Sequence, residues 1–465
     1  MDYAVNTELF KTTFSVAEDG KKLTHKHGKQ FQAFPFNTLQ ESREPAVDSL
    51  DALVGYYLSL IEGITPKAVD LDSLLEQLEK ETKIEPGKEE LFREIVSQLF
   101  FENGQLRSLN LKMREYAPCP ELKEIRIAEY LIDVLGDRDI LQGLVKQAMD
   151  ALSARSNVFE RLVISKLEHS EDKPQNWTHY TPITTAVKSV FEQDFEYILL
   201  SEARTRDYLL PLLEFYYFAY TAQACLHLER LCDGNPASVT PIYFCLEWEK
   251  TSQSRQCYTK GWQRLERSVD KLFAHVITLE ILNQIIGEGR YDYVKLARIA
   301  AGSPEDDAQL AGQIRVLSTL YRNAITDSRE MKKVTLGTVS DKRTPVEIRF
   351  LFESVKAQFE DTPRRKNDRT YAEKFKKFCE KNFLKLRGRS GYMLSLSEEI
   401  LIFLTKVCVK DQEILRLKDV FEEFERRGVF LDNVSKEQVT QYFEKLNLIE
   451  KKSDSGDAKY VKRIL

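Results

Sequence analysis

The sequence predicts a mainly α protein: a multi-helix body followed by a C-terminal winged-helix domain of three helices plus a β-hairpin. Three observations support this prediction. Apolar residues recur with a helical period through most of residues 48–360. The segment 214–231 is apolar on nearly every face, as is typical of a central buried helix. From residue 448 onward the apolar period changes to two, which indicates that helices give way to strands.

The body divides into three predicted regions. Residues 1–47 alternate between polar and apolar without a helical period, so we expect an extended N-terminal arm docked on the body. Residues 48–167 are predicted to form a helical domain whose first helix begins at Asp48 or Ser49 and ends at Gly63. The polar, proline-containing segment 168–182 predicts a domain boundary, followed by a second helical domain over residues 183–360.

Within the second domain, one long helix is predicted over residues 259–286. Its apolar residues follow the spacing of a coiled-coil seam, but the seam lasts under about three heptads. We therefore expect it to pack inside the chain rather than to form a dimer. The seam residues are Trp262, Leu265, Val269, Leu272, Val276 and Leu279.

The C-terminal domain is predicted over residues 395–465, with helices at 395–409, 417–428 and 433–447. Gly428 should end the second helix, and Ser435 should cap the third, since Gln438 follows three residues later as in a capping box. Two short strands, 448–452 and 459–465, flank a turn containing Gly456. Three helices followed by a hairpin is the order of a winged helix.

Charge is unevenly distributed along the chain. The whole sequence carries a net charge of −5, which does not favour a protein coated in nucleic acid. Residues 361–390, however, hold eleven Lys or Arg against four Asp or Glu, a net of +7. This stretch belongs to a predicted basic linker or helix over residues 361–394. It could be a binding surface or a solvated helix face, and the sequence favours neither.

We predict weak, sequence-independent DNA binding, because cations that neutralise phosphates release bound counterions. Base reading is not favoured, since Lys436 and Lys445 on the third helix are balanced by Glu437 and Glu444. A winged helix that binds protein remains the alternative. Arg387 and Arg389 flank Gly388 and are expected to reach adjacent phosphates. The predicted DNA-binding residues, clusters without matching carboxylates in the sequence, are Arg364, Arg365, Lys366, Arg387, Arg389, Lys451, Lys452, Lys459, Lys462 and Arg463.

No catalytic, cofactor-binding or metal-binding residue is assigned, and we do not expect an enzyme. The sequence lacks GxxxxGK[ST], GxGxxG and HExxH. A zinc site drawn from Cys225, His227, Cys232, Cys245 and Cys257 would lack a CxxC knuckle. The nuclease-like triplet Glu121-Leu122-Lys123 lies in a helical pattern rather than in a strand. Scattered cysteines, no secretory signal and no bilayer-length apolar run predict a cytoplasmic protein.

Several C-terminal strings resemble the DptG family, also called DndG: LRGRSGYMLSLSEEILIFLTKVC, FEEFERRGVFLD and IEKKSDSGDAKYVKRIL, with KHGKQFQAFPFNT near the N-terminus. The resemblance covers roughly residues 386–465 and that one N-terminal patch. It implies a bacterial defence protein: a non-catalytic subunit of the restriction system that depends on DNA phosphorothioation. Such a subunit would act beside two larger ATPase partners on DNA without sulfur in its backbone. A transcription regulator and a cryptic nuclease remain alternatives.

Overall fold

The computed structural model describes residues 3–64, 71–102, 105–106, 120–153, 161, 163, 177–201, 205–286, 290–337, 342–451 and 458–464. The protein is mainly helical, as predicted. The helices are α1 (Thr7–Phe14), α2 (Val54–Glu62), α3 (Leu71–Glu81), α4 (Glu89–Phe100), α5 (Leu122–Leu135), α6 (Arg138–Ser153), α8 (Lys188–Ser201), α9 (Thr205–Leu228), α10 (Gln263–Val269), α11 (Leu272–Leu282), α12 (Tyr293–Ala300), α13 (Pro304–Ala324), α14 (Arg329–Lys333), α15 (Arg343–Glu360), α16 (Arg365–Asn382), α17 (Glu398–Val409), α18 (Leu417–Arg426) and α19 (Asn433–Lys445).

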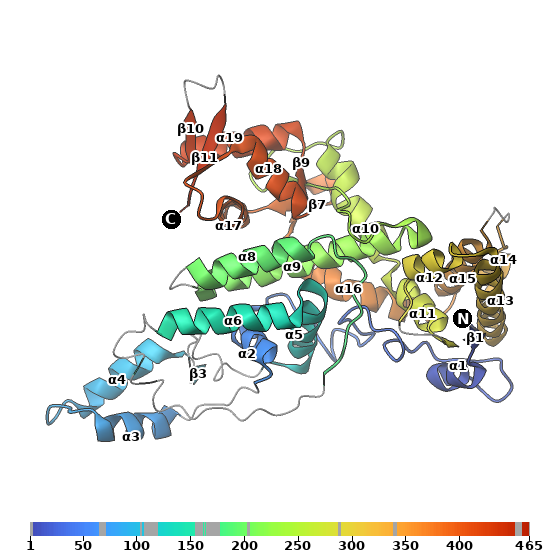
Figure 1. Cartoon of the computed structure of the whole chain (residues 1–465), viewed down its shortest axis with the longest axis horizontal. Coiled ribbons are helices and arrows are strands. Elements are labelled where there is room, and N and C mark those ends of the chain that lie inside the picture. Colours follow the sequence, from blue (N-terminus) through green and yellow to red (C-terminus); the bar gives the residue numbers. More distant parts are fainter. Residues whose placement is uncertain are drawn as a thin grey trace.

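Short strands complete the fold: β1 (Ala4–Val5), β2 (Phe101–Glu102), β3 (Gln105–Leu106), β4 (Ile242–Leu246), β5 (Ile285–Ile286), β6 (Leu384–Leu386), β7 (Tyr392–Leu396), β8 (Ile414–Arg416), β9 (Val429–Leu431), β10 (Ile449–Lys451) and β11 (Lys459–Lys462). In Figure 1, α8 and α9 cross the middle of the molecule, with the C-terminal elements on one side and α5 and α6 on the other. Helices α11 to α15 gather at one end. No helix of the described ranges is long and apolar enough to cross a membrane.

The N-terminal arm docks on the body but is not wholly extended. The prediction missed α1, which Asn6 caps by accepting a hydrogen bond from the backbone N–H of Leu9. The following residues, 24–40, run along the body without regular structure, and the Phe31 and Phe34 rings are fully buried. The buried Glu280 carboxylate accepts hydrogen bonds from the backbone N–H groups of residues 29–31, at 2.7–3.2 Å. The arm is thus part of the core.

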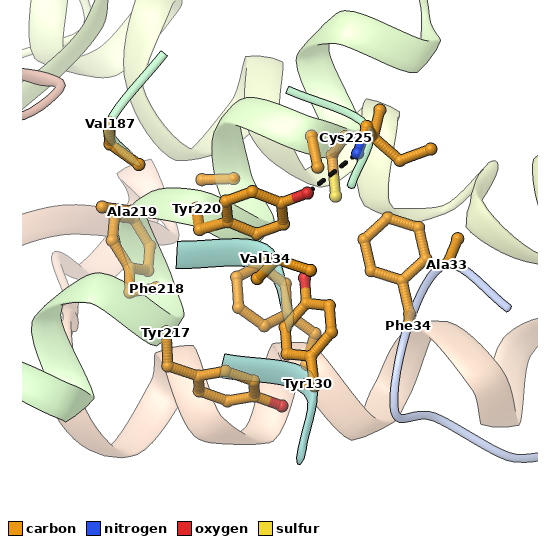
Figure 2. Packing of buried hydrophobic residues seen from close by; sticks show 14 of the residues in the cluster. Ala33, Phe34, Tyr130, Val134, Val187, Tyr217, Phe218, Ala219, Tyr220 and Cys225 are labelled. Atoms are coloured by element: carbon orange, nitrogen blue, oxygen red, sulfur yellow. Dashed lines mark hydrogen bonds between the residues drawn. The ribbon is translucent and has the colours of Figure 1, made fainter. Parts of the chain in front are cut away.

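Helix α9 is the central buried helix that the sequence predicts. Every side chain from Phe215 to Leu228 is buried. Tyr217, Phe218 and Tyr220 project from α9 toward α5, α16 and the arm, where Tyr220 packs edge-on against Tyr130 at 5.7 Å (Figure 2). The Tyr220 hydroxyl accepts a hydrogen bond from the backbone N–H of Ile183 at 2.9 Å, so its polar end is satisfied inside the core.

The first helix of the body begins later than predicted. It starts at Val54 after a 3₁₀ turn over Asp51–Leu53, not at Asp48 or Ser49. It ends as predicted at Gly63, whose φ of 77° is the left-handed conformation that glycine adopts without strain.

The prediction of one continuous helix over residues 259–286 is wrong. The segment contains a π-helical turn (Tyr258–Trp262), then α10, a break at Asp270 and Lys271, then α11 and β5. All six seam residues are nevertheless buried within the chain. The break keeps Asp270 and Lys271 close to helical backbone angles, so the apolar spacing continues across it. An apolar period therefore identifies the buried face but not the interruption.

A four-stranded sheet of order β6-β7-β4-β9 joins the body to the C-terminal region. β4 comes from the loop after α9 and pairs in parallel with both β7 and β9, while β6 pairs antiparallel with β7. The apolar run of β4 suits a strand with neighbours on both sides. One continuous cluster of buried side chains extends from Tyr3 to Val461, across all the regions predicted as separate domains.

The C-terminal region contains α17, α18 and α19 and a second sheet of order β10-β11-β8. Strand β8, between α17 and α18, was not predicted; it pairs antiparallel with β11. Gly428 follows α18 with a φ of 86°, as expected for a helix stop. The predicted cap of α19 is wrong: Asp432, not Ser435, is the N-cap, and its carboxylate accepts the backbone N–H of Ser435 at 3.0 Å. Gly456 lies outside the described residues.

Candidate functional site

The first three predicted DNA-binding residues lie at the start of α16, but they are not equivalent. Arg364 is partly buried and donates to both carboxylate oxygens of Asp327, at 2.7 and 3.1 Å, and to Gln358 at 2.7 Å. Arg364 therefore has a matching carboxylate, contrary to the reasoning from the sequence. Arg365 and Lys366 are exposed.

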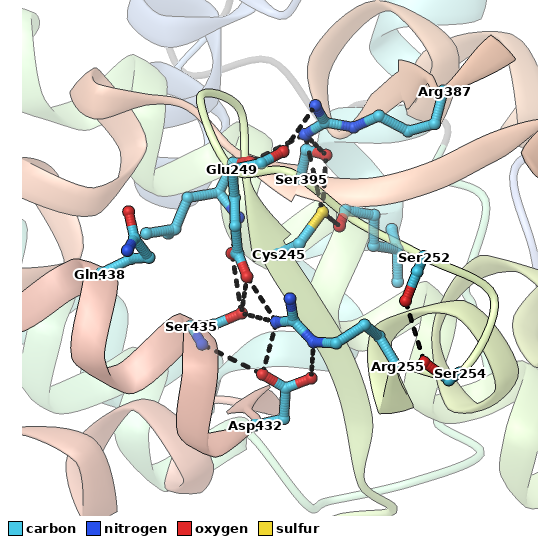
Figure 3. A network of polar contacts seen from close by, with 12 residues as sticks. Cys245, Glu249, Ser252, Ser254, Arg255, Arg387, Ser395, Asp432, Ser435 and Gln438 are labelled. Carbon is cyan, nitrogen blue, oxygen red and sulfur yellow. Dashed lines mark hydrogen bonds and ion pairs between the residues drawn. The ribbon is translucent and has the colours of Figure 1, made fainter.

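Arg387 and Arg389 also differ. Arg387 points into the protein, where it donates to the backbone oxygens of Leu246 at 2.8 Å and Glu249 at 3.1 Å (Figure 3). Gly388, with a φ of 55°, turns the chain, and Arg389 is exposed. The expectation that both guanidiniums reach adjacent phosphates is corrected for Arg387, because its hydrogen bonds fix it between β4 and β7.

The predicted cations of the hairpin have partners at the surface. Lys459 pairs with Glu444 at 3.0 Å and Arg463 with Asp411 at 3.3 Å, while Lys462 donates to a backbone oxygen at 3.3 Å. Lys451 is exposed, and Lys452 lies outside the described residues. Exposed ion pairs contribute about 0–1 kcal/mol, so these lysines can exchange a carboxylate for a phosphate at little cost.

A groove on the C-terminal region adds two cations, Arg416 and Lys418, that the sequence analysis did not name. It lies between α18, α19 and β11, and Arg416, Lys418 and Lys436 line it together with Lys459. Phe421 also lines it, and the Lys436 ammonium lies 5.4 Å from the centre of that ring. The missed signal is strand β8: its pairing with β11 places Arg416 beside Tyr460.

The solvent face of α19 does not favour base reading. Its exposed residues include Val434, Glu437, Gln441 and Glu444. Glu437 and Glu444 are accompanied by one exposed lysine, Lys445, so this face has no excess of positive charge for phosphates. Asp432 caps the N-terminal end of the helix. Its carboxylate also accepts two hydrogen bonds from Arg255, at 2.6 and 2.8 Å.

Arg255 belongs to a polar network between the loop after β4 and α19 (Figure 3). The Ser435 hydroxyl donates to the Glu249 carboxylate at 2.9 Å, and that carboxylate also accepts from Arg255 and from the backbone N–H of Leu246. Burial alone would raise the pKa of Asp432, but the hydrogen bonds from Arg255 and Ser435 hold it below its usual value. Ser435, predicted as a cap, instead connects the body to α19.

A thiol pair adjoins this network. Cys245 on β4 lies 3.2 Å from the Ser395 hydroxyl and 3.7 Å from an Arg387 nitrogen. A hydrogen bond from Cys257, together with Ser395 and Arg387, lowers the pKa of Cys245 below the usual value of a thiol. Both cysteines are fully buried, so this thiol is not an accessible nucleophile in this conformation.

The other predicted exclusions can be placed in the fold. Burial raises the pKa of Cys225 in α9, which suits a core thiol rather than a metal ligand. Within the described ranges, no three or more His, Cys, Asp or Glu residues come together as a metal site would require. Glu121 caps α5 and Lys123 lies in its first turn, so the nuclease-like triplet lies at a helix start.

No model of a known protein family matches this chain, and no curated protein matches it.

Proposed function

We propose that this protein is a non-catalytic subunit of a DNA phosphorothioation-dependent restriction complex, in which it scaffolds ATPase partners and contacts DNA lacking phosphorothioate. The proposal takes its biological context from the resemblance of the C-terminal strings to the DptG family. One structural observation carries it further: the arrangement of the C-terminal region and its fixed attachment to a large helical body.

That arrangement supports the proposal of a winged helix. The elements follow the order α17, β8, α18, α19, β10, β11, apart from β9, and β8 completes a three-stranded sheet with the hairpin. Winged helices are variants of the helix-turn-helix and bind nucleic acid or protein. Since the face of α19 carries Glu437 and Glu444, backbone contact through the hairpin and Arg416 is favoured over base reading. This argues for DNA contact without sequence preference, and against a transcription regulator.

The attachment supports a scaffolding role. Arg427 after α18 forms a buried ion pair with Asp194 on α8, and β9 pairs with β4 of the body. Such contacts hold the C-terminal region in one orientation on the helical body. A subunit that must present DNA to larger motor partners would need such an orientation.

The proposal is tested by measuring whether the complex assembles and how tightly it binds DNA. The chain is co-expressed with the two ATPase partners that the resemblance implies, and the purified complex is titrated with labelled duplex DNA at several salt concentrations. A Lys451→Glu/Lys462→Glu variant should bind DNA more weakly, with a salt slope smaller by about two, because two phosphate contacts are lost. A Glu437→Lys/Glu444→Lys variant, which replaces carboxylates by lysines, is the control with the opposite change of charge. If the hairpin variant keeps its DNA affinity but leaves the complex, the hairpin is an assembly surface and the DNA assignment is wrong.

A further inference from the structure

A second charged groove lies on the body, where α10, α11, α15 and α16 meet. It encloses about 620 Å³ and is separate from the winged helix. We call it the α16 groove. Its lining residues are Arg267, Asp270, Lys271, Lys356, Phe359, Glu360, Arg365, Asp368 and Arg369.

Three arginines of the α16 groove are exposed. Arg365 and Arg369 lie one turn apart on α16, and Arg267 faces them from α10. In the described part of the chain, none of the three forms an ion pair. The two lysines of the groove differ, since Lys271 pairs with Glu229 at 2.6 Å and Lys356 with Glu353 at 2.8 Å. The guanidiniums can therefore receive an external anion.

The negative charge of the carboxyl groups in the groove is partly neutralised, so they repel an anion less than three free carboxylates would. Asp270 pairs with Lys376 at 2.7 Å. Asp368 lies between Arg365 and Arg369 and is partly buried; burial, and then the nearby Asp270, raise its pKa to about 7. Asp368 is therefore protonated more readily than an exposed aspartate. A protonated carboxyl is a hydrogen-bond donor. Of the lining carboxyl groups, only Glu360 is both exposed and without an ion pair within the described residues.

We propose that the α16 groove binds a phosphate group, with Arg267, Arg365 and Arg369 contacting its oxygens. Arginine suits this role, because its planar fork matches two phosphate oxygens. The start of α16 adds the positive end of its helix dipole on the same side. The phosphate could belong to a DNA backbone or to a small phosphorylated molecule. The DNA alternative rests on the proposed function, whereas the phosphate site itself does not.

The Asp368 carboxylate should take up a proton when a phosphate binds in this groove. A carboxylate there would repel the ligand, so affinity should fall as pH rises through the pKa of Asp368. The charged groups that line the groove with Asp368 are Arg267 from α10, Asp270 and Lys271 between α10 and α11, Lys356 and Glu360 from α15, and Arg365 and Arg369 from its own helix. Asp368→Asn fixes the neutral state and should remove this pH dependence.

The experiment uses the full chain and two probes, sodium pyrophosphate and a short labelled DNA duplex, with affinities measured by calorimetry and fluorescence anisotropy. Arg365→Gln/Arg369→Gln should weaken pyrophosphate binding about tenfold or more, since two charge-assisted contacts are lost. Lys21→Gln/Lys22→Gln, which removes the same charge from exposed positions on the arm, should have no effect. Asp368→Asn should bind several-fold more tightly than the native chain at about pH 8 and equally at about pH 6. Melting curves check that each variant folds.

The outcomes separate this inference from the proposed function. Weakened binding of both probes in the arginine variant supports a site for DNA phosphates. Weakened pyrophosphate binding with unchanged DNA binding supports a site for a small phosphorylated molecule. Equal pyrophosphate affinities of the native chain, the arginine variant and the lysine control would overturn the phosphate site, even if the complex assembles and the hairpin binds DNA. Loss of complex assembly with an intact arginine effect would overturn only the proposed function.

Discussion

Arg427 and Asp194 form a two-pronged ion pair that is almost completely enclosed by protein. The Arg427 Nε and Nη2 atoms donate to the two carboxylate oxygens of Asp194 at 2.7 and 2.6 Å, and the side chains are 1% and 0% exposed. The Tyr216 hydroxyl donates to the same carboxylate at 2.7 Å, and Lys410 lies 3.1 Å away. One residue follows α18 and the other lies on α8, so the pair joins the C-terminal region to the body.

Removing one member of this pair should be strongly destabilising. Arg427→Met leaves a buried carboxylate with reduced compensation and should lower the free energy of unfolding by about 3–5 kcal/mol. The neighbouring Arg426 pairs with Glu423 at the surface, so Arg426→Met should cost less than about 1 kcal/mol. Chemical denaturation of the two variants compares them directly. Similar losses in both would show that burial of the Arg427 pair is unimportant.

The hydrogen bonds to Glu280 should keep the N-terminal arm closed to proteases. Glu280→Gln retains one acceptor oxygen but loses the charge that strengthens the bonds from residues 29–31, at a cost of about 1–3 kcal/mol. Trypsin should then cut at Lys26 and Lys29 faster than in the native chain. Glu229→Gln, which alters a surface ion pair, is the control. Unchanged cleavage at these lysines would mean that other contacts hold the arm.

Glu129 should make stability depend on pH. Burial raises the pKa of this carboxyl from 4.5 to about 7, against opposing hydrogen bonds from Thr178. A raised pKa in the folded state gives stability that is fully present below about pH 4.5 and lost as pH rises through about 7. Glu129→Gln removes the buried charge, so at about pH 8 it should be more stable than the native chain by about 1–3 kcal/mol. Melting temperatures of Glu129→Gln and the native chain at about pH 5 and pH 8 test this prediction. The same difference between the two proteins at both pH values would contradict it.

Gly428 should resist substitution. Its φ of 86° is unfavourable for other residues, and a Cβ atom there would lie 3.2 Å from the Gln223 side chain. Gln223 exchanges two hydrogen bonds with the backbone of Thr240, at 2.7 and 2.9 Å, so it cannot easily move. Gly428→Ala should cost about 1–3 kcal/mol. Gly312→Ala, in the open interior of α13, should instead stabilise by up to about 1 kcal/mol. Calorimetric melting curves should show shifts of opposite sign.

Local patterns predicted the helical elements well but could not predict partners distant in sequence. α9 was recognisable because burial on all faces requires apolar residues all round, and Gly63 and Gly428 because helix stops need positive φ. β4 was missed because its neighbours, β7 and β9, lie far along the chain. The same limit affected the basic residues: a local charge count could not show that Asp327 pairs with Arg364, or that Arg387 points inward.

The position of β4 also bears on how the chain is made. Parallel pairing aligns Ile242 with Val429, roughly 190 residues apart, and pairings of such high contact order form slowly. During synthesis, β4 leaves the ribosome long before β9 exists, so its free edge must wait for the last part of the chain. We therefore expect nascent chains that end before residue 429 to expose this strand, and to be the species most in need of a chaperone.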